Sequence, residues 1–327
     1  MTLVLGIDLG GTFIKAGLVR FHEVVARDKR PTEADHGTEA VLANIVAASR
    51  ACLEKGGVGS RQIDGLCVAV PSPISPDRRT PVSTPNLKCL MGVPVAERVA
   101  QEVGCKGLIE NDANAAVLGE KYFGVGQGSS DIVLLTLGTG VGGGVISGGQ
   151  LLRGPRNASG ELGHIGIVPG GRLCGCGRRG CLEAHVSIGA LIARGHALCP
   201  TLSLDEENGP RILADAARRG DAAAQRVFAE MGDYLGQGIV DLVNVFGPDV
   251  LVLSGGLSNC FDLFQSSMWQ TVRKDCGFET LRDPLRIEVS QLGQDGPILG
   301  AAAAFLESIE ERTRSGNSSP SAGPRES

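Results

Sequence analysis

Hydrophobic and polar positions along the chain change period several times, and the changes predict alternating strands and helices. Apolar runs at 3–8 and 14–19 predict two strands joined by a glycine turn. Apolar residues at helical spacing follow at 38–55, and a continuous apolar strand follows at 65–70. Strands are further expected at 107–110 and 249–256, and helices near 94–103 and at 113–121, 210–219 and 221–246. This alternation indicates an α/β fold.

The strand–turn–strand pattern occurs twice. Residues 131–149 repeat the order seen at the N-terminus, with an apolar strand, a Gly/Thr turn and a second strand that ends at glycine. Two similar α/β domains with a ligand between them would explain this repeat. Two unrelated glycine hairpins in one chain remain the alternative. The last stretch, 312–327, is polar, rich in Ser and Pro and without periodicity, so we expect a disordered tail.

Composition narrows the function classes. The chain has 327 residues, a net charge of −5 and 48 glycines, about twice the usual share. The negative charge argues against nucleic acid or a membrane surface as the primary partner. No apolar run reaches about 18 residues, and the N-terminus does not resemble a signal peptide. The ten cysteines therefore predict a reducing, cytoplasmic location.

The first glycine turn is a candidate phosphate site. Gly10, Gly11 and Thr12 offer backbone amides and a hydroxyl without an intervening Cβ. Asp8, at the end of the preceding strand, is placed to hold Mg²⁺ through water, and Lys15 adds a possible charge. An ordinary Gly-Gly hairpin turn is the alternative.

The second glycine turn, Gly138-Thr139-Gly140, opens a G-x-G-x-x-G pattern that also occurs in dinucleotide sites and protein kinases. A dinucleotide turn should lead into a helix, but the residues that follow predict a strand. The V-A-I-K and H-R-D segments of protein kinases and a Walker A sequence are absent from the sequence. A second phosphate-binding hairpin is the remaining interpretation. A third turn, Gly255-Gly256, follows a buried strand and would let a base or ribose lie against the backbone; a plain strand-to-helix turn is equally consistent.

A candidate catalytic base follows the strand at 107–110. Asn111 and Asp112 stand at a carboxyl strand end, where ligands bind in α/β sheets. Asp112 could accept a hydroxyl proton during phosphoryl transfer. It could instead cap the next helix, which is the commonest role of Asp at such a position.

One histidine and three cysteines fall within 18 residues, at His164, Cys174, Cys176 and Cys181. A Cys₃His set suits tetrahedral zinc, and a disulfide with a free thiol is disfavoured in a reducing compartment. Two carboxylates, Glu161 and Glu183, lie among these ligands. A polar ligand such as a sugar beside the metal would account for them.

These motifs together resemble the repressor/open-reading-frame/kinase (ROK) family of sugar kinases and regulators. The resemblance runs from Leu3 to about Leu306 and rests on GELGH with CGCGRRGCLE, LTLGTGVGGGVI and VLSGGLS. It implies an actin-like, hexokinase-type ATPase fold, with two α/β domains around a ligand cleft. We expect domains at 1–117 and 118–295, the second holding the zinc site, and a C-terminal helix at 296–311 that packs back on the first.

The resemblance also implies roles for individual residues. Asp112 matches the catalytic base, and the three turns match the contacts to ATP and its Mg²⁺. The implied sugar contacts are Asn86, Asn111, Asp112, Glu161, His164 and Glu183. The implied ligands of a structural Zn²⁺ are His164, Cys174, Cys176 and Cys181. Lys88-Cys89-Leu90-Met91 replaces a segment in which the family often has an aromatic residue, so the wall of the sugar pocket departs from the pattern.

The expected activity is ATP-dependent phosphorylation of a hexose, with glucose first and N-acetylmannosamine, N-acetylglucosamine or fructose as alternatives. A homodimer is the usual arrangement in the family. A sugar-sensing regulator without turnover is the main rival, but the first strand begins at Leu3, so we expect no helix-turn-helix ahead of it. A nicotinamide-dependent oxidoreductase is the third hypothesis, and binding of NADH but not ATP would favour it.

Overall fold

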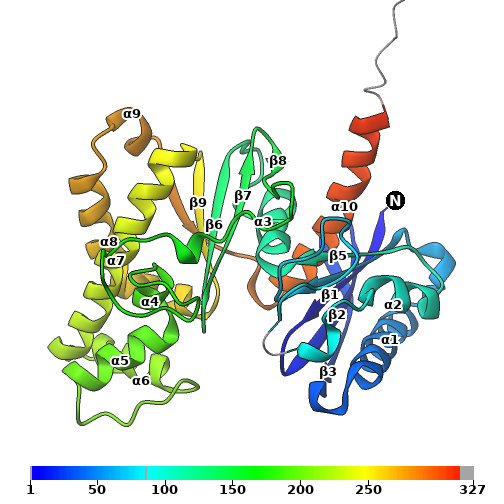
Figure 1. Cartoon of the computed structure of the whole chain (residues 1–327), viewed down its shortest axis with the longest axis horizontal. Helices are drawn as coiled ribbons and strands as arrows, with labels where there is room; N and C mark the ends of the chain where they lie inside the picture. Colours follow the sequence, from blue (N-terminus) through cyan, green and yellow to red (C-terminus); the bar gives the residue numbers. More distant parts are fainter. Residues whose placement is uncertain (1, 85–86, 317–327) are drawn as a thin grey trace, which may run out of the picture. The chain divides into compact units, whose positions relative to one another are not determined.

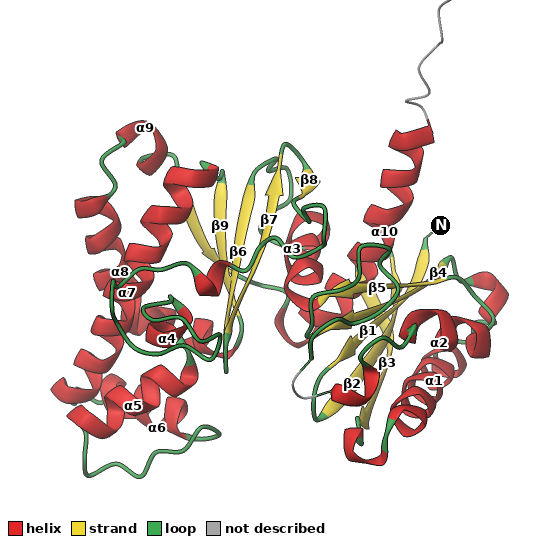
Figure 2. Ribbon diagram, viewed as in Figure 1, coloured by secondary structure: helices red, strands yellow, loops and turns green. Residues whose placement is uncertain are grey.

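A computed structural model describes residues 2–84 and 87–316 of the chain. The described residues form two compact units, one within 2–119 and 294–316 and one of residues 120–293. Each unit contains one five-stranded sheet, as Figures 1 and 2 show. The α/β class predicted from the alternating pattern is therefore confirmed.

The first unit has a mixed sheet of order β3-β2-β1-β4-β5. Its strands are β1 (Leu3–Leu9), β2 (Phe13–Arg20), β3 (Glu23–Pro31), β4 (Gly65–Val70) and β5 (Gly107–Asn111), and its helices are α1 (Thr38–Lys55), α2 (Val95–Val103), the start of α3 (Asp112–Phe123) and α10 (Gly296–Gly316). β1, β2 and β3 are antiparallel neighbours, whereas β4 and β5 run parallel to β1. The sequence did not predict β3, because its charged residues mask the strand pattern.

Successive side chains of β1 point to opposite faces of the first sheet. Leu5, Ile7 and Leu9 are buried in one core with residues of α1. Gly6 points the other way, where an added Cβ would lie 2.1 Å from the carbonyl oxygen of Ile298. Glycine at this position therefore lets α10 pack against the opposite face of the sheet. α10 continues to Gly316, five residues into the stretch expected as a tail, and residues 317–327 lie outside the described part.

The second unit has a sheet of order β10-β9-β6-β7-β8. Its strands are β6 (Ile132–Leu137), β7 (Val141–Ser147), β8 (Gln150–Leu151), β9 (Val250–Ser254) and β10 (Arg286–Val289), and its helices are α4 (Glu183–Val186), α5 (Ile188–Leu198), α6 (Gly209–Arg218), α7 (Ala222–Phe246), α8 (Phe261–Asp275) and α9 (Glu279–Arg282). Here β6 and β7 are antiparallel, and β9 and β10 run parallel to β6. Strand order and direction thus repeat those of the first unit, so the repeat seen in the sequence is a repeat of topology.

Candidate functional site

The glycine turn of the first unit lies between β1 and β2 and is braced from β3. The amide of Gly10 donates to the carbonyl of Phe13 at 3.0 Å, so that amide closes the turn. Buried Thr32 donates from Oγ1 to the carbonyl of Gly10 at 2.7 Å, and its amide donates to the carbonyl of Thr12 at 2.9 Å. In the described part of the chain, no hydrogen bond from the amides of Gly11 and Thr12 to another backbone group is found. These amides, rather than that of Gly10, are the donors suited to a phosphate.

Asp8 stands on β1 directly opposite Lys15 on β2. The Lys15 Nζ lies 3.3 Å from the Asp8 Oδ2, and the carboxylate is largely buried. Burial raises the pKa of Asp8, and the charge of Lys15 and its hydrogen bond oppose that shift. A carboxylate that accepts one hydrogen bond from Lys15 still has oxygen lone pairs, and carboxylate oxygen is the ligand that Mg²⁺ prefers. The lysine expected at the phosphate is therefore already paired with Asp8.

Asn111, not Asp112, caps α3. The Asn111 Oδ1 accepts hydrogen bonds from the amides of Ala113 and Asn114, both at 3.0 Å. Asp112 is the first residue of the helix and is exposed, and its Oδ1 accepts from the amide of Ala113 at 2.8 Å. The capping role that competed with catalysis for Asp112 thus belongs mainly to its neighbour. The positive end of the α3 dipole favours a negative charge on Asp112.

Strand register places these groups on one edge of the first sheet. Asp8 is aligned with Ala69 on β4, which is aligned with Glu110 on β5. Adjacent strands lie about 4.8 Å apart, so the rows of Asp8 and Glu110 are about 10 Å apart, with Asn111 one residue further on. Asn86 lies outside the described residues.

Sequence reasoning missed a buried ion pair beneath Asn111. Fully buried Glu110 accepts at Oε1 from the amide of Asn111 at 3.0 Å and from Asn114 Nδ2 at 3.2 Å. Its Oε2 accepts from Arg78 at 3.0 Å, and Arg78 also bonds Glu311 of α10 at 3.0 Å. This network fixes the strand end that carries Asn111 and Asp112. A single carboxylate inside an otherwise apolar strand was the available sequence signal.

In the second unit, the turns Gly138–Gly140 and Gly255–Gly256 are neighbours, because β6 and β9 pair in parallel and align Thr136 with Ser254. Gly255 has φ 86°, and an added Cβ would lie 2.4 Å from the carbonyl oxygen of Leu137. Gly256 has no atom within 4 Å of its Cβ position. Gly255 therefore shapes the turn, while Gly256 leaves open space beside it for a flat group.

The glycines after Thr139 serve packing as well. An added Cβ on Gly163 would lie 2.0 Å from the carbonyl oxygen of Val141, and one on Gly143 would lie 2.5 Å from Leu162 Cγ. The turn that carries Glu161 and His164 thus rests directly on β7. Close packing against Leu162 therefore explains the glycine at 143, the last of the G-x-G-x-x-G pattern, so this glycine does not indicate a dinucleotide-binding site.

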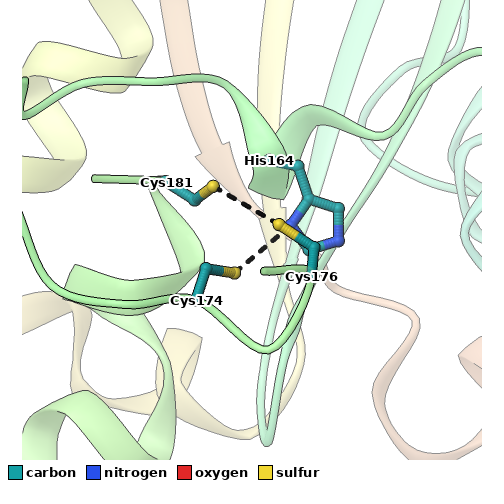
Figure 3. Close-up of side chains that lie close together, drawn as sticks. All are labelled: His164, Cys174, Cys176 and Cys181. Carbon is teal, nitrogen blue, oxygen red and sulfur yellow. Dashed lines mark hydrogen bonds between the residues drawn. The ribbon is translucent and has the colours of Figure 1, made fainter. Parts of the chain in front are cut away.

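The Cys₃His set forms one cluster. The four ligand atoms of His164, Cys174, Cys176 and Cys181 lie within 4.8 Å of one another. Figure 3 shows the three thiols and the imidazole converging from two loops. Cys176 Sγ lies 3.7 Å from Cys181 Sγ, and Cys174 Sγ lies 3.6 Å from His164 Nδ1.

These separations fit a tetrahedral zinc site. Zinc–sulfur bonds of about 2.3 Å place two sulfurs about 3.8 Å apart, and a shorter zinc–nitrogen bond places sulfur and nitrogen about 3.6 Å apart. A disulfide needs sulfurs about 2.05 Å apart, so the pair at 3.7 Å is not one. Burial raises the pKa of Cys174 to about 12, so without a metal this thiol keeps its proton. It then donates to Glu183 Oε1 at 3.3 Å.

His164 and Glu183 both contact Cys174, which brings two of the expected sugar residues to the metal cluster. His164 presents Nδ1 to the cluster, so Nε2 is the ring nitrogen left for another partner. Glu161 is exposed and begins the short turn that ends at His164. Two of the expected sugar residues, His164 and Glu183, therefore lie at the Cys₃His cluster, and Glu161 precedes the turn that carries His164.

Two α/β units of identical sheet topology, each with a glycine turn between its first two strands, define the actin-like, hexokinase-type ATPase fold. The chain belongs to the ROK family, whose model matches residues 4–308. It is 34% identical over 318 residues to a glucokinase from Thermotoga maritima, covering 94% of this chain and 98% of that protein.

Solved structures agree with this assignment. A ROK hexokinase from Thermus thermophilus matches with a TM-score of 0.82 at 32% identity, covering 94% of this chain and 100% of the other. A ROK family glucokinase from Streptomyces griseus, in complex with glucose and AMPPNP, matches with a TM-score of 0.78 at 32% identity. That match covers 92% of this chain and 98% of the other.

Proposed function

We propose that this protein transfers the γ-phosphoryl group of ATP to a hydroxyl of glucose. The similarity to glucokinases over nearly the whole chain supports a hexose kinase. The observation that carries the chemistry is the position of Asp112, an exposed carboxylate directly after the carboxyl end of β5 and next to Asn111, which accepts two amides of the first turn of α3.

In this mechanism Asp112 takes the proton of the attacking hydroxyl. The hydroxyl oxygen bonds to the γ-phosphorus while the bond from that phosphorus to the β–γ bridging oxygen breaks, and ADP leaves. In the first unit, the amides of Gly11 and Thr12 are the proposed donors to phosphate oxygens. In the second unit, those of Thr139 and Gly140 are the proposed donors, and the open side of Gly256 is the proposed place for adenosine. Bound Mg²⁺, held near Asp8 through water, would neutralise phosphate charge.

The zinc that we assign to the Cys₃His cluster is structural. Four protein ligands complete a tetrahedron and leave no open coordination position. His164 would hold the metal through Nδ1, which would leave Nε2 and the carboxylates of Glu161 and Glu183 to bind sugar hydroxyls. We also propose a homodimer, which light scattering on the purified protein would test.

Among the helices of residues 2–84 and 87–316, none combines the length and hydropathy needed to cross a bilayer.

A coupled assay of ADP release over a panel of hexoses tests the proposal. We expect the highest kcat/KM for glucose, above those for N-acetylmannosamine, N-acetylglucosamine and fructose. ADP release must also require sugar, and the Asp112→Asn variant serves as the inactive control. Sugar binding by calorimetry without turnover on any hexose would instead identify a sugar-sensing regulator.

A further inference from the structure

A buried polar cluster lies in the second unit, next to the helix that carries Glu183. His185 on α4 and Arg194 on α5 are only 4% and 5% exposed. The His185 ring packs against the ring of Tyr234 from α7, with centroids 4.4 Å apart and planes tilted by 38°. α4, α5 and α7 contact one another, and Figure 2 shows them in one group of helices. The sugar and nucleotide chemistry proposed above uses none of these three side chains.

The nitrogens of this cluster are incompletely satisfied. Arg194 donates from NH2 to the carbonyl of His185 at 3.3 Å, and its Nε lies 3.2 Å from Glu230. Within the described residues, its buried NH1 and both ring nitrogens of His185 have no hydrogen-bond partner. The Arg194 guanidinium also lies over the Tyr234 ring, 5.4 Å from its centroid, but an aromatic face does not replace a hydrogen-bond acceptor. Buried polar atoms without hydrogen-bond partners are costly and rare, so these three nitrogens around Tyr234 point to a missing group.

Charge is unbalanced at the same place. Glu230 is the carboxylate paired with Arg194, and it also accepts from Arg226 at 2.8 Å. Arg172, from the loop before the cysteines, brings a third guanidinium to α5, where it donates to the carbonyl of Ala190, four residues before Arg194. Burial, followed by the charge of Arg172, lowers the pKa of both His185 and Arg194. Glu230 is therefore shared by two arginines, Arg194 and Arg226, and no carboxylate is found paired with Arg172 within the described residues.

We propose that His185, Arg194 and Arg172 form a binding site for a small inorganic anion, a halide or an oxyanion. The unpaired NH1 of Arg194, one N–H of the His185 ring and the guanidinium of Arg172 are donors of the kind that hold anions. A water molecule would satisfy hydrogen bonds but leave the excess positive charge, whereas an anion does both. Arg172 is exposed, so it connects the buried nitrogens to solvent.

Such an anion would brace the short helix α4, on which His185 follows Glu183 by two residues. Arg172 also binds α5, donating to the carbonyl of Ala190 at 3.4 Å. The anion site would thus connect the loop before Cys174, which carries Arg172, to helices α4 and α5. It does not depend on which sugar the enzyme phosphorylates.

Anomalous diffraction locates the ion directly. Crystals of the full chain would be soaked in sodium bromide in one arm and in sodium selenate in the other. We expect an anomalous peak within about 3.5 Å of Arg194 NH1 in at least one arm, and the arm that shows it separates a halide from an oxyanion. An ordered water only, or a carboxylate from a second copy of the chain in that position, overturns the proposal.

Thermal unfolding provides the solution test. The melting temperature of sugar- and nucleotide-free protein would be measured against chloride, sulfate and glutamate at constant ionic strength. We expect a saturable rise with chloride or sulfate but not with bulky glutamate. Arg172→Gln should raise the half-saturating concentration about tenfold, because it removes a charged donor. Arg211→Gln, an exposed arginine on α6, is the charge-matched control and should leave the titration unchanged. Identical titrations of Arg172→Gln and wild type would refute the site.

Discussion

Glu183 accepts a hydrogen bond from the backbone amide of Val141 at 3.0 Å, through its Oε2. The turn before Val141 fits closely around this carboxylate, since an added Cβ on Gly140 would lie 2.7 Å from the same oxygen. The other oxygen, Oε1, faces Cys174 at 3.3 Å. One side chain therefore links the cysteine cluster to the glycine turn proposed for phosphate. Glycine at 140 is required by this contact as much as by a ligand.

Asp112→Asn should lose most turnover and keep its stability. The amide cannot take the hydroxyl proton, and a positioned base contributes about 10²–10⁴-fold in rate. The cap of α3 survives, because Asn111 supplies it. Steady-state ADP release and thermal melting measure the two effects, and a kcat near that of wild type would remove Asp112 from the base role.

Asn111→Ala, to be compared with Asp112→Asn, tests which residue caps α3. It should destabilise the protein by about 1 kcal/mol through loss of the cap. Asp112→Asn should leave the melting temperature within error of wild type. If Asn111→Ala melted like wild type, Asn111 would not be the cap of α3.

Gly255→Ala and Gly256→Ala should behave oppositely, although they are adjacent. Alanine at 255 must adopt φ near 86° and push against the Leu137 carbonyl, which should cost at least about 2 kcal/mol. Alanine at 256 meets no atom within 4 Å, so folding should change by only about 0.5 kcal/mol. Its methyl group would instead occupy the space assigned to adenosine.

Denaturant unfolding and the KM for ATP distinguish the pair. Gly256→Ala should raise the KM for ATP severalfold and leave the KM for glucose unchanged, while Gly255→Ala should lower stability first. An unchanged KM for ATP in a folded Gly256→Ala protein would move the nucleotide away from this turn.

The metal-ligand cluster and the glycine hairpins could be predicted from the sequence, because each depends on residues close together in the chain. The spacing of Cys174, Cys176 and Cys181 with His164 predicted one cluster, and the structure brings all four together. The repeat of strand, glycine turn and strand predicted two similar units, and the sheets share one topology. In both cases the short sequence separation fixes the geometry.

Hydrogen bonds and ion pairs between residues far apart in the chain could not be predicted from the sequence. Thr32 braces a turn 20 residues earlier, and Arg78 reaches Glu110 and Glu311 from a proline-rich loop. Such contacts depend on tertiary packing and have no periodic signal. The same reason hid the link from Glu183 to Val141, which spans 42 residues.

Asp8→Asn should stabilise the metal-free protein at neutral pH. Burial raises the pKa of Asp8 above its ordinary 3.8, so the folded state binds this proton more tightly than the unfolded state does. The contribution of Asp8 to stability therefore falls as pH rises from 3.8 through the raised pKa, and the penalty is complete above it. The amide removes the penalty.

Melting curves from pH 4 to 8 without Mg²⁺ or ATP test this sign. Asp8→Asn should melt about 1–4 °C above wild type at the upper end, with the difference shrinking toward acid pH. Turnover with MgATP should fall in the same variant. A lower melting temperature at neutral pH would mean that the pair with Lys15 outweighs the cost of burying the carboxylate.

Cys176→Ser should separate the sugar side of the site from the adenosine side. Losing one of four ligands should lower zinc content measured by mass spectrometry, and the loop that holds His164 and Glu183 should loosen. We expect the KM for glucose to rise about 10–100-fold.

The nucleotide side should be affected much less. The Gly255–Gly256 turn packs against Leu137, and Ser258 donates to the Gly255 carbonyl at 2.7 Å, so AMPPNP affinity should change only a few-fold. That small change should come through Glu183 and Val141. Cys105→Ser, a half-buried cysteine of the first unit outside both the cluster and the expected sugar pocket, is the control and should keep zinc, KM and affinity. Active enzyme without zinc, or metal loss that abolishes AMPPNP binding and spares glucose binding, would contradict a structural metal on the sugar side.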